Sequence, residues 1–235
     1  MNMRGFTLVV LTIVTSTALA GEITVGRIQG EVLVRAGMQE TWQSVKKGDK
    51  LKPHDSMKTG VNSTAVLLVS ANEGAPAKIT LPPNVILDLS DVRTLTRDEL
   101  ILQLTMERVR SSEYDWKNSE LEIPNATVVH GERKDEAGGD GTDEGTARLR
   151  MNGTKVLFQN GFFSTCALKG LSLMGRFPSL GETFENRYMV AESLERSDLR
   201  GEALHEYLAL SSLPNLTSEQ QRLVRSGITR LRGEG

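Results

Sequence analysis

The sequence is poor in several features that would point to a particular chemistry. It has a single cysteine, Cys166, so no internal disulfide can form and the chain must fold by packing alone. We expect Cys166 to be a small buried side chain rather than a nucleophile. The net charge of −2 and the 5% content of aromatic residues give no basis for binding phosphate backbones or stacking on bases. These absences predict that nucleic acid is not a partner.

Local catalytic and metal-binding motifs are also missing. Glycine-rich nucleotide loops and the G-x-S-x-G nucleophile motif do not occur in the sequence. The histidines His54, His130 and His205 lack the spacing of a zinc site. The nearby carboxylates Asp88 and Asp91 are interpreted as a solvated pair that occurs by chance. The sequence therefore predicts no enzyme, no cofactor and no metal site, and it identifies no binding residues.

The first 20 residues have the pattern of a bacterial signal peptide. Arg4 supplies a positive charge, residues 6–14 are mostly apolar, and Ala18-Leu19-Ala20 is a cleavage sequence. Elsewhere no segment approaches the roughly 18 apolar residues that cross a bilayer. We expect a periplasmic or secreted protein, cut after Ala20 and not membrane-spanning; a retained N-terminal anchor is the alternative.

Residues 21–131 show the periodicity of short strands. Apolar residues recur at near-alternate positions, and glycine, proline and Gly-Asp turns interrupt them. This pattern predicts an antiparallel β roll or sandwich. The stretch 98–110 fits both periods poorly, and we predict a strand there because its neighbours are strands. Residues 121–129 are expected to form the last strands.

The order of motifs in this region resembles the FecR domain. The motifs are Gly30-Glu31-Val32, Trp42 followed by Gly48-Asp49, Thr59-Gly60 before an apolar strand, Pro83-Asn84, and the segment 124–131. We expect Gly60 to adopt a positive φ, Asn84 to form a tight turn and Trp42 to be a buried anchor. FecR proteins that regulate iron uptake carry an anti-sigma segment and a membrane helix before this domain. This sequence has neither, so the resemblance implies only an exported β module.

Residues 132–145 have the composition of an acidic, glycine-rich linker. Ala137 is their single apolar side chain, too little to offset the entropy of ordering the segment. Within it, residues 138–143 match the start of one calcium-binding nonapeptide, but such sites need stacked copies, so a flexible linker is the better interpretation. The linker predicts a boundary between two domains, 21–131 and 146–231.

Residues 146–231 are predicted to be helical and to contain a repeat. Two segments, 167–180 and 203–216, share an Ala-Leu pair, a large residue four positions after the alanine, an apolar-Pro step and a final leucine, at an offset of 36 residues. Other signals are Asn160-Gly161 as a helix end, Asp198 as an N-cap, and Thr217 with Gln220 as a capping box. Five helices are expected.

These hairpins resemble tetratricopeptide repeats (TPR). That family has small residues where its helices cross, large residues beside them and a proline at the end of the unit. The residues that match this pattern are Ala167, Pro178, Ala191, Ala203, Tyr207 and Pro214. The unit is two residues longer than is usual in the family, and Lys155 stands where a small residue is expected. A plain pair of α-hairpins is the alternative.

The resulting hypothesis is a multidomain protein with an N-terminal FecR-like β part and C-terminal TPR-like helices. Repeats of this kind present a surface rather than carry chemistry. We expect an exported, non-enzymatic adaptor or scaffold of the cell envelope that binds a protein or peptide, with self-association as a way of completing the short array. The alternative is a module that binds cell-wall glycan, with the helices as a spacer. Trp42, Tyr114 and Trp116 are its candidate aromatic residues.

Overall fold

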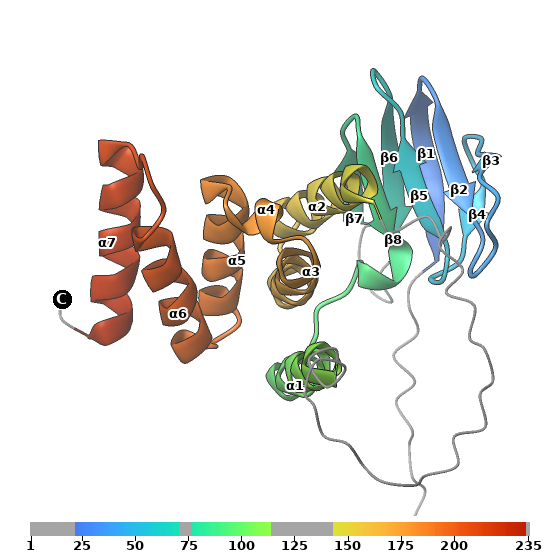
Figure 1. Ribbon diagram of the computed structural model, residues 1–235. Coiled ribbons are helices and arrows are strands. Elements are labelled where there is room, and N and C mark those ends of the chain that lie inside the picture. The colour runs from blue at the N-terminus through green and yellow to red at the C-terminus, as the bar shows by residue number, and fades with distance from the viewer. Residues whose placement is uncertain (1–21, 71–76, 114–142, 234–235) are drawn as a thin grey trace, which may run out of the picture.

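The computed structural model describes residues 22–70, 77–113 and 143–233. Within them lie two antiparallel sheets of four strands, ordered β4-β1-β6-β7 and β3-β2-β5-β8 (Figure 1). We call these sheets together the β part. The strands are β1 (Ile23–Gln29), β2 (Val32–Arg35), β3 (Gln43–Ser44), β4 (Lys50–Leu51), β5 (Ser56–Thr59), β6 (Thr64–Val69), β7 (Ala77–Leu81) and β8 (Val85–Asp88).

Strand register explains how the β part buries its apolar residues. Val25, Leu67 and Ile79 lie opposite one another across the first sheet, and all three side chains are buried. Met57 and Leu87 form the equivalent row in the second sheet. Because side chains alternate between the faces of a strand, the next row of the second sheet points the other way. The predicted antiparallel β architecture is confirmed at this level.

Turn chemistry is only partly as predicted. Asn84 adopts a φ of 59°, as expected for the residue after Pro83. Gly60, however, is not in the left-handed region, and the prediction of a positive φ there is wrong. The left-handed residue of this turn is Asn62, at a φ of 68°. Gly60 instead uses its backbone: its amide donates to the Glu31 carbonyl, and its own carbonyl accepts from the Ser63 amide.

The segment predicted as a strand over 98–110 is a helix, α1 (Arg97–Glu113), which follows the short 3-10 helix η1 (Leu89–Asp91). Thr96 and Glu99 start it with reciprocal bonds: the Thr96 amide donates to the Glu99 carboxylate at 2.8 Å, and the Glu99 amide donates to the Thr96 hydroxyl at 3.3 Å. Leu100 and Leu104, four residues apart, then lie buried on one face. The prediction failed because it rested on the neighbouring strands and not on this cap.

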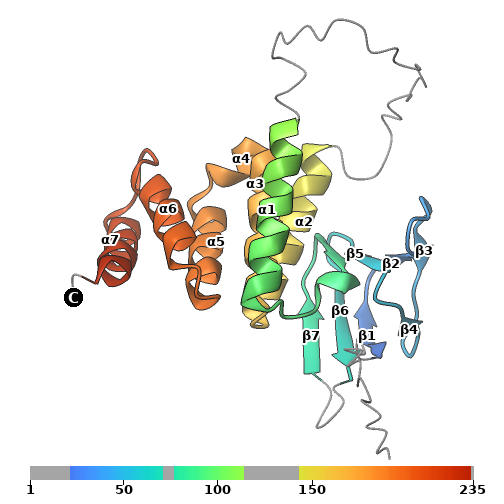
Figure 2. The same ribbon diagram turned by 90° about the horizontal axis from the view of Figure 1, so that it is seen from below.

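The remaining helices form a row that leads away from the β part (Figure 1). We call this the helical row; it consists of α2 (Glu144–Gln159), α3 (Phe163–Arg176), α4 (Pro178–Gly181), α5 (Phe184–Arg196), α6 (Arg200–Ser211) and α7 (Ser218–Arg232). α2 packs on β8, and the later helices pack on the preceding ones, up to α7 against α6. α1 lies beside α3 (Figure 2).

Several predicted helix boundaries are confirmed. Asn160 ends α2 and Gly161 follows at a φ of 83°. Thr217 and Gln220 form the capping box of α7. Asp198 is not an N-cap: it takes a left-handed φ of 59°, and Leu199 precedes α6 without a side-chain cap. The N-cap position falls one residue later, at Leu199, because α6 begins at Arg200.

Small residues lie where neighbouring elements approach most closely. Ala167, Ala191 and Ala203 are fully buried, as expected for helix crossings. The approach is closer still at Gly153, since a Cβ there would lie 2.0 Å from the Ile86 carbonyl oxygen of β8. At Gly170, a Cβ would lie 2.3 Å from a Val190 methyl group of α5. Backbone and side chains therefore fill the space that any larger residue would need.

The β part and the helical row share one core. The buried apolar residues form a single cluster from Ile23 in β1 to Leu231 in α7. The predicted linker 132–145 also ends earlier than expected, because Asp143 caps α2 by accepting a bond from the Thr146 amide at 2.7 Å. In space, α2 packs directly on β8. The signal peptide 1–20, most of the linker and the strands expected at 121–129 lie outside the described residues.

Candidate functional site

The residues that the sequence singled out for the repeat are structural. Tyr207 is buried, packs edge-on against Tyr188 and donates to Glu195 at 3.2 Å. Pro178 is the first residue of α4 rather than only the end of α3, which suits a residue without an amide hydrogen. Pro214 follows the end of α6. None of these side chains presents a reactive group.

Residues that could ligate a metal do not cluster in the described part of the chain. Residues 22–70, 77–113 and 143–233 contain no cluster of histidine, cysteine and carboxylate side chains that could hold a metal. His54 and His205 are exposed on separate parts of the molecule. Cys166 is buried as predicted, and burial raises the pKa of its thiol to about 12, well above the range of a nucleophilic cysteine.

Trp42 corrects one sequence prediction, because it is half-buried rather than part of the core. Its ring lies 5.0 Å from the Arg35 guanidinium and 5.6 Å from the Lys58 ammonium. Arg35 and Lys58 share the outer face of the second sheet, since register pairs Arg35 with Ser56, two residues before Lys58. The indole therefore lies against the charged ends of two cations on this face of the sheet. Tyr114 and Trp116 lie outside the described residues.

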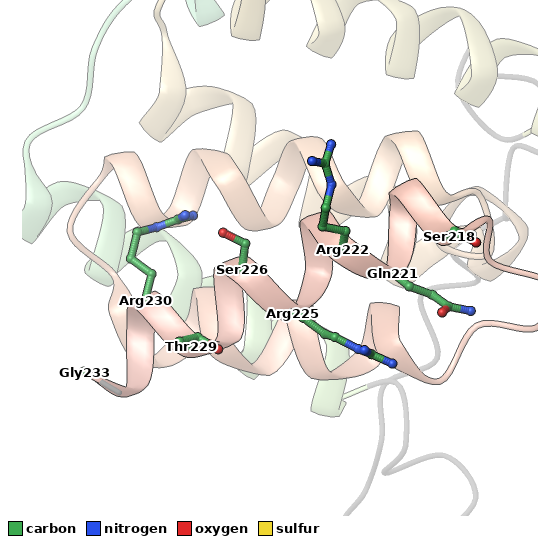
Figure 3. A pocket seen from close by; sticks show the side chains of 8 residues that line it. All are labelled: Ser218, Gln221, Arg222, Arg225, Ser226, Thr229, Arg230 and Gly233. Carbon is green, nitrogen blue, oxygen red and sulfur yellow. The ribbon is translucent and has the colours of Figure 1, made fainter. Parts of the chain in front are cut away.

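A broad surface hollow of about 860 Å³ follows the outer side of α7, the last helix of the row (Figure 3). Its lining is polar and basic along the length of the helix: Ser218, Gln221, Arg222, Arg225, Ser226, Thr229, Arg230 and Gly233. Arg222 and Arg225 are exposed and extend to different sides of the helix (Figure 3). We call these residues the basic face. The opposite side of α7 is buried against α6 through Val224, Gly227 and Leu231.

α7 is held firmly against the rest of the row. Arg230 donates to Glu195 of α5 at 2.7 Å. Arg200 of α6 donates to the carbonyls of Arg230 and Leu231 in the last turn of α7, at 3.2 and 3.3 Å. A cation at that end also complements the helix dipole. The basic face is thus presented on a rigid support.

A second hollow lies where the β part meets the helical row. It is a cleft of about 400 Å³, and we call it the junction cleft. One wall comes from the second sheet and η1, and the other walls come from α2 and α3. The lining residues are Arg35, Ile86, Leu87, Asp88, Asp91, Arg150, Gly153, Thr154, Leu157, Lys169, Ser172, Leu173 and Arg176. Its volume lies within the range of pockets that bind small ligands.

Ion pairs organise one wall of the junction cleft. Asp88 accepts from Arg150 of α2 at 2.7 Å and from the Ser56 hydroxyl at 2.6 Å. Asp91 pairs with Lys169 of α3 at 3.1 Å. The two carboxylates are 23% and 13% exposed, so the interpretation of a solvated pair is wrong. They join the β part to α2 and α3, and their partners Arg150 and Lys169 lie over 60 residues further along the chain.

The two acids have opposite pKa shifts. Burial alone would raise the pKa of Asp88, but the charge of Arg150 and the hydrogen bond from Ser56 outweigh it, so the pKa is lowered. Burial raises the pKa of Asp91, because the attraction of Lys169 does not fully compensate for desolvation. Asp88 is therefore the firmly ionised member of the pair.

Hydrogen bonds between distant segments fix the walls of the cleft. The Leu95 amide donates to Ser164 of α3 at 2.8 Å, and the neighbouring Thr165 hydroxyl donates to the Arg93 carbonyl at 2.6 Å. The Asn152 side chain donates to the Asn84 carbonyl at 2.9 Å. Together with the close contact at Gly153, these bonds make the cleft a preformed feature of the fold.

Comparisons with family models, with curated proteins and with solved structures give no match for this chain. The resemblances to FecR domains and to TPR repeats therefore stay predictions from the sequence. Of the helices in the described residues, none combines the length and apolarity needed to cross a bilayer.

Proposed function

We propose that this chain is a non-enzymatic adaptor of the bacterial cell envelope that binds an acidic segment of a partner protein on the basic face of α7. The proposal keeps the FecR-like and TPR-like resemblances and an exported location, periplasmic or secreted. Its main support is the helical row, which projects from the β part and ends in a polar, basic helix. An open row of helices exposes much surface for its size, which suits presentation to a partner.

The chemistry of the basic face selects the partner. Arg222 and Arg225 provide two exposed guanidinium groups, which form paired hydrogen bonds with carboxylates. Ser218, Ser226 and Thr229 add hydroxyl groups along the same hollow. An extended or helical segment rich in Glu and Asp complements this combination. Since the contacts are exposed, salt should weaken the binding strongly.

Fluorescence anisotropy with labelled hexaglutamate tests this proposal on the purified protein. The double variant Arg222→Glu/Arg225→Glu should weaken binding at least tenfold, because it replaces two attractive contacts by repulsion. The matched control Lys46→Glu/Lys47→Glu makes the same charge change at exposed positions between β3 and β4 and should leave binding unchanged. An equal loss in both variants, or no binding by the unmodified protein at low salt, would overturn the proposal.

The glycan-binding alternative is favoured by one observation, the partial exposure of Trp42 beside Arg35 and Lys58. Aromatic rings with neighbouring polar groups are suitable platforms for sugar rings. Retention of the protein on purified peptidoglycan, lost in Trp42→Ala and kept in Arg222→Glu/Arg225→Glu, is the result that supports this function. Failure of the unmodified protein to sediment with peptidoglycan would dismiss it.

A further inference from the structure

We propose that the junction cleft is a binding site for a small organic carboxylate, either a free acid or the C-terminus of a peptide. This inference goes beyond the adaptor function, because the cleft lies at the opposite end of the helical row from the basic face. It starts from the shape of the cleft, about 400 Å³ between the second sheet, α2 and α3.

The charge balance of the lining favours an anion. Four cationic side chains line the cleft, Arg35, Arg150, Lys169 and Arg176, against the two acids Asp88 and Asp91. Ser172 of the lining also donates to Glu107 of α1 at 2.8 Å. Arg150 and Lys169 are paired with Asp88 and Asp91, whereas Arg176 has no carboxylate partner within the described residues. A singly charged anion would bring this wall close to neutrality.

Donor geometry supports the same conclusion. A guanidinium carries five N–H donors, and the 2.7 Å bond from Arg150 to Asp88 uses one of them. The Trp42 ring stacks against the guanidinium of Arg35 and limits the directions in which that group can point. Fixed arginine groups bind planar carboxylates with two parallel bonds.

The apolar part of the lining separates a carboxylate from inorganic phosphate. Ile86, Leu157 and Leu173 line the cleft beside the charged groups. These side chains can cover a short carbon chain attached to the anionic group. Phosphate has no such chain and carries more than one negative charge near neutral pH, more than the single charge of Arg176 can neutralise.

Isothermal titration calorimetry on the full protein tests this inference with defined probes. Butyrate represents a free acid, acetyl-Ala-Ala represents a peptide terminus, and neutral butyramide is the control ligand. We expect one of the two carboxylates to bind at a single site and butyramide to give no heat. The carboxylate that binds more tightly identifies the source of the ligand.

Matched variants place the site. Arg176 is exposed at the rim, so Arg176→Gln should preserve the fold and weaken carboxylate binding about tenfold, the effect of one charged hydrogen bond. Lys169→Gln should act in the same direction. Arg148→Gln, on α2 but outside the lining, should leave affinity unchanged, and thermal melting checks the folding of all three. The inference is overturned if neither carboxylate binds at concentrations up to about 10 mM. It is also overturned if inorganic phosphate binds more tightly than both carboxylates, or if Arg176→Gln binds with unchanged affinity.

Discussion

Replacing Gly153 by alanine is the most direct test of how the β part and the helical row are joined. Gly153 lies in the middle of α2, where alanine is normally the better helix former by about 1 kcal/mol. In this fold, however, an added Cβ would lie 2.0 Å from the Ile86 carbonyl oxygen and 3.0 Å from its carbonyl carbon. Both atoms belong to the backbone of β8, so no rotamer change can relieve the contact, and α2 must move away from the sheet.

The expected cost follows from these two opposing effects. Overpacking of a tight core contact costs about 1–3 kcal/mol, and the rigid backbone places this site in the upper half of that range. After the gain in helix propensity is subtracted, Gly153→Ala should lower the free energy of unfolding by about 1–2 kcal/mol. For a chain of this size that corresponds to a fall in Tm of roughly 2–8 °C.

Gly175→Ala is the matched control for this experiment. Gly175 also lies in a helix, α3, but a Cβ there would have no neighbour within 4 Å. The control should therefore leave stability unchanged or raise it by up to about 1 kcal/mol. Thermal and urea denaturation followed by circular dichroism measure both variants. A Gly153→Ala protein as stable as the unmodified one would refute the packing of α2 on β8 described above.

Three further predictions concern single side chains. Gly227→Ala would bring a Cβ to 2.7 Å from the buried Tyr207 ring, so it should lower the free energy of unfolding by about 1–3 kcal/mol in urea denaturation. Cys166, with its pKa raised to about 12, should react with a disulfide reagent at pH 8 or so only after unfolding, and rapid reaction of the native protein would contradict its burial. The lowered pKa of Asp88 means that its ionised form stabilises the fold above a pH of about 4 and that this stabilisation is lost as the pH falls through the folded pKa. Asp88→Asn should therefore reduce Tm at neutral pH and lose less further stability than the unmodified protein on acidification below about pH 4; a parallel loss in both proteins would contradict the assignment.

Local chemistry predicted helix boundaries better than element types. The capping pair Thr217 and Gln220 starts α7 as expected, because both partners lie within one turn. The same pattern at Thr96 and Glu99 starts α1, yet periodicity and neighbouring strands led to a strand prediction there. A cap is a physical interaction of the segment itself, whereas the identity of the neighbouring elements is only a prior.

The contact between α2 and β8 depends on tertiary packing and could not be predicted from the sequence. From the sequence, Gly153 only weakens a helix, but in the fold it allows α2 to touch the backbone of β8. The partner in that contact, Ile86, lies far away in the sequence and in another element type. The composition of residues 132–145 predicts a linker but says nothing of what packs across it, so this contact could not be anticipated.

The junction cleft could not be predicted from the sequence for the same reason. Asp88 and Asp91 have a spacing that occurs by chance in many sequences, and their partners Arg150 and Lys169 come from two later helices. No local pattern links these four residues. Only the register of the second sheet, which points Asp88 toward α2, brings them together.

The shared core has a consequence for how an adaptor of this kind would work. A flexible linker would let two binding modules move independently, and each would then pay the full entropy of ordering when both are occupied. Here the contact at Gly153, the ion pairs of Asp88 and the anchoring of α7 through Arg230 connect the β part to the far end of the row. The basic face and the junction cleft are thus held at a fixed separation and orientation. A partner that reaches both would gain affinity from this rigidity, and Gly153→Ala, which moves α2 away from the sheet, would weaken that gain.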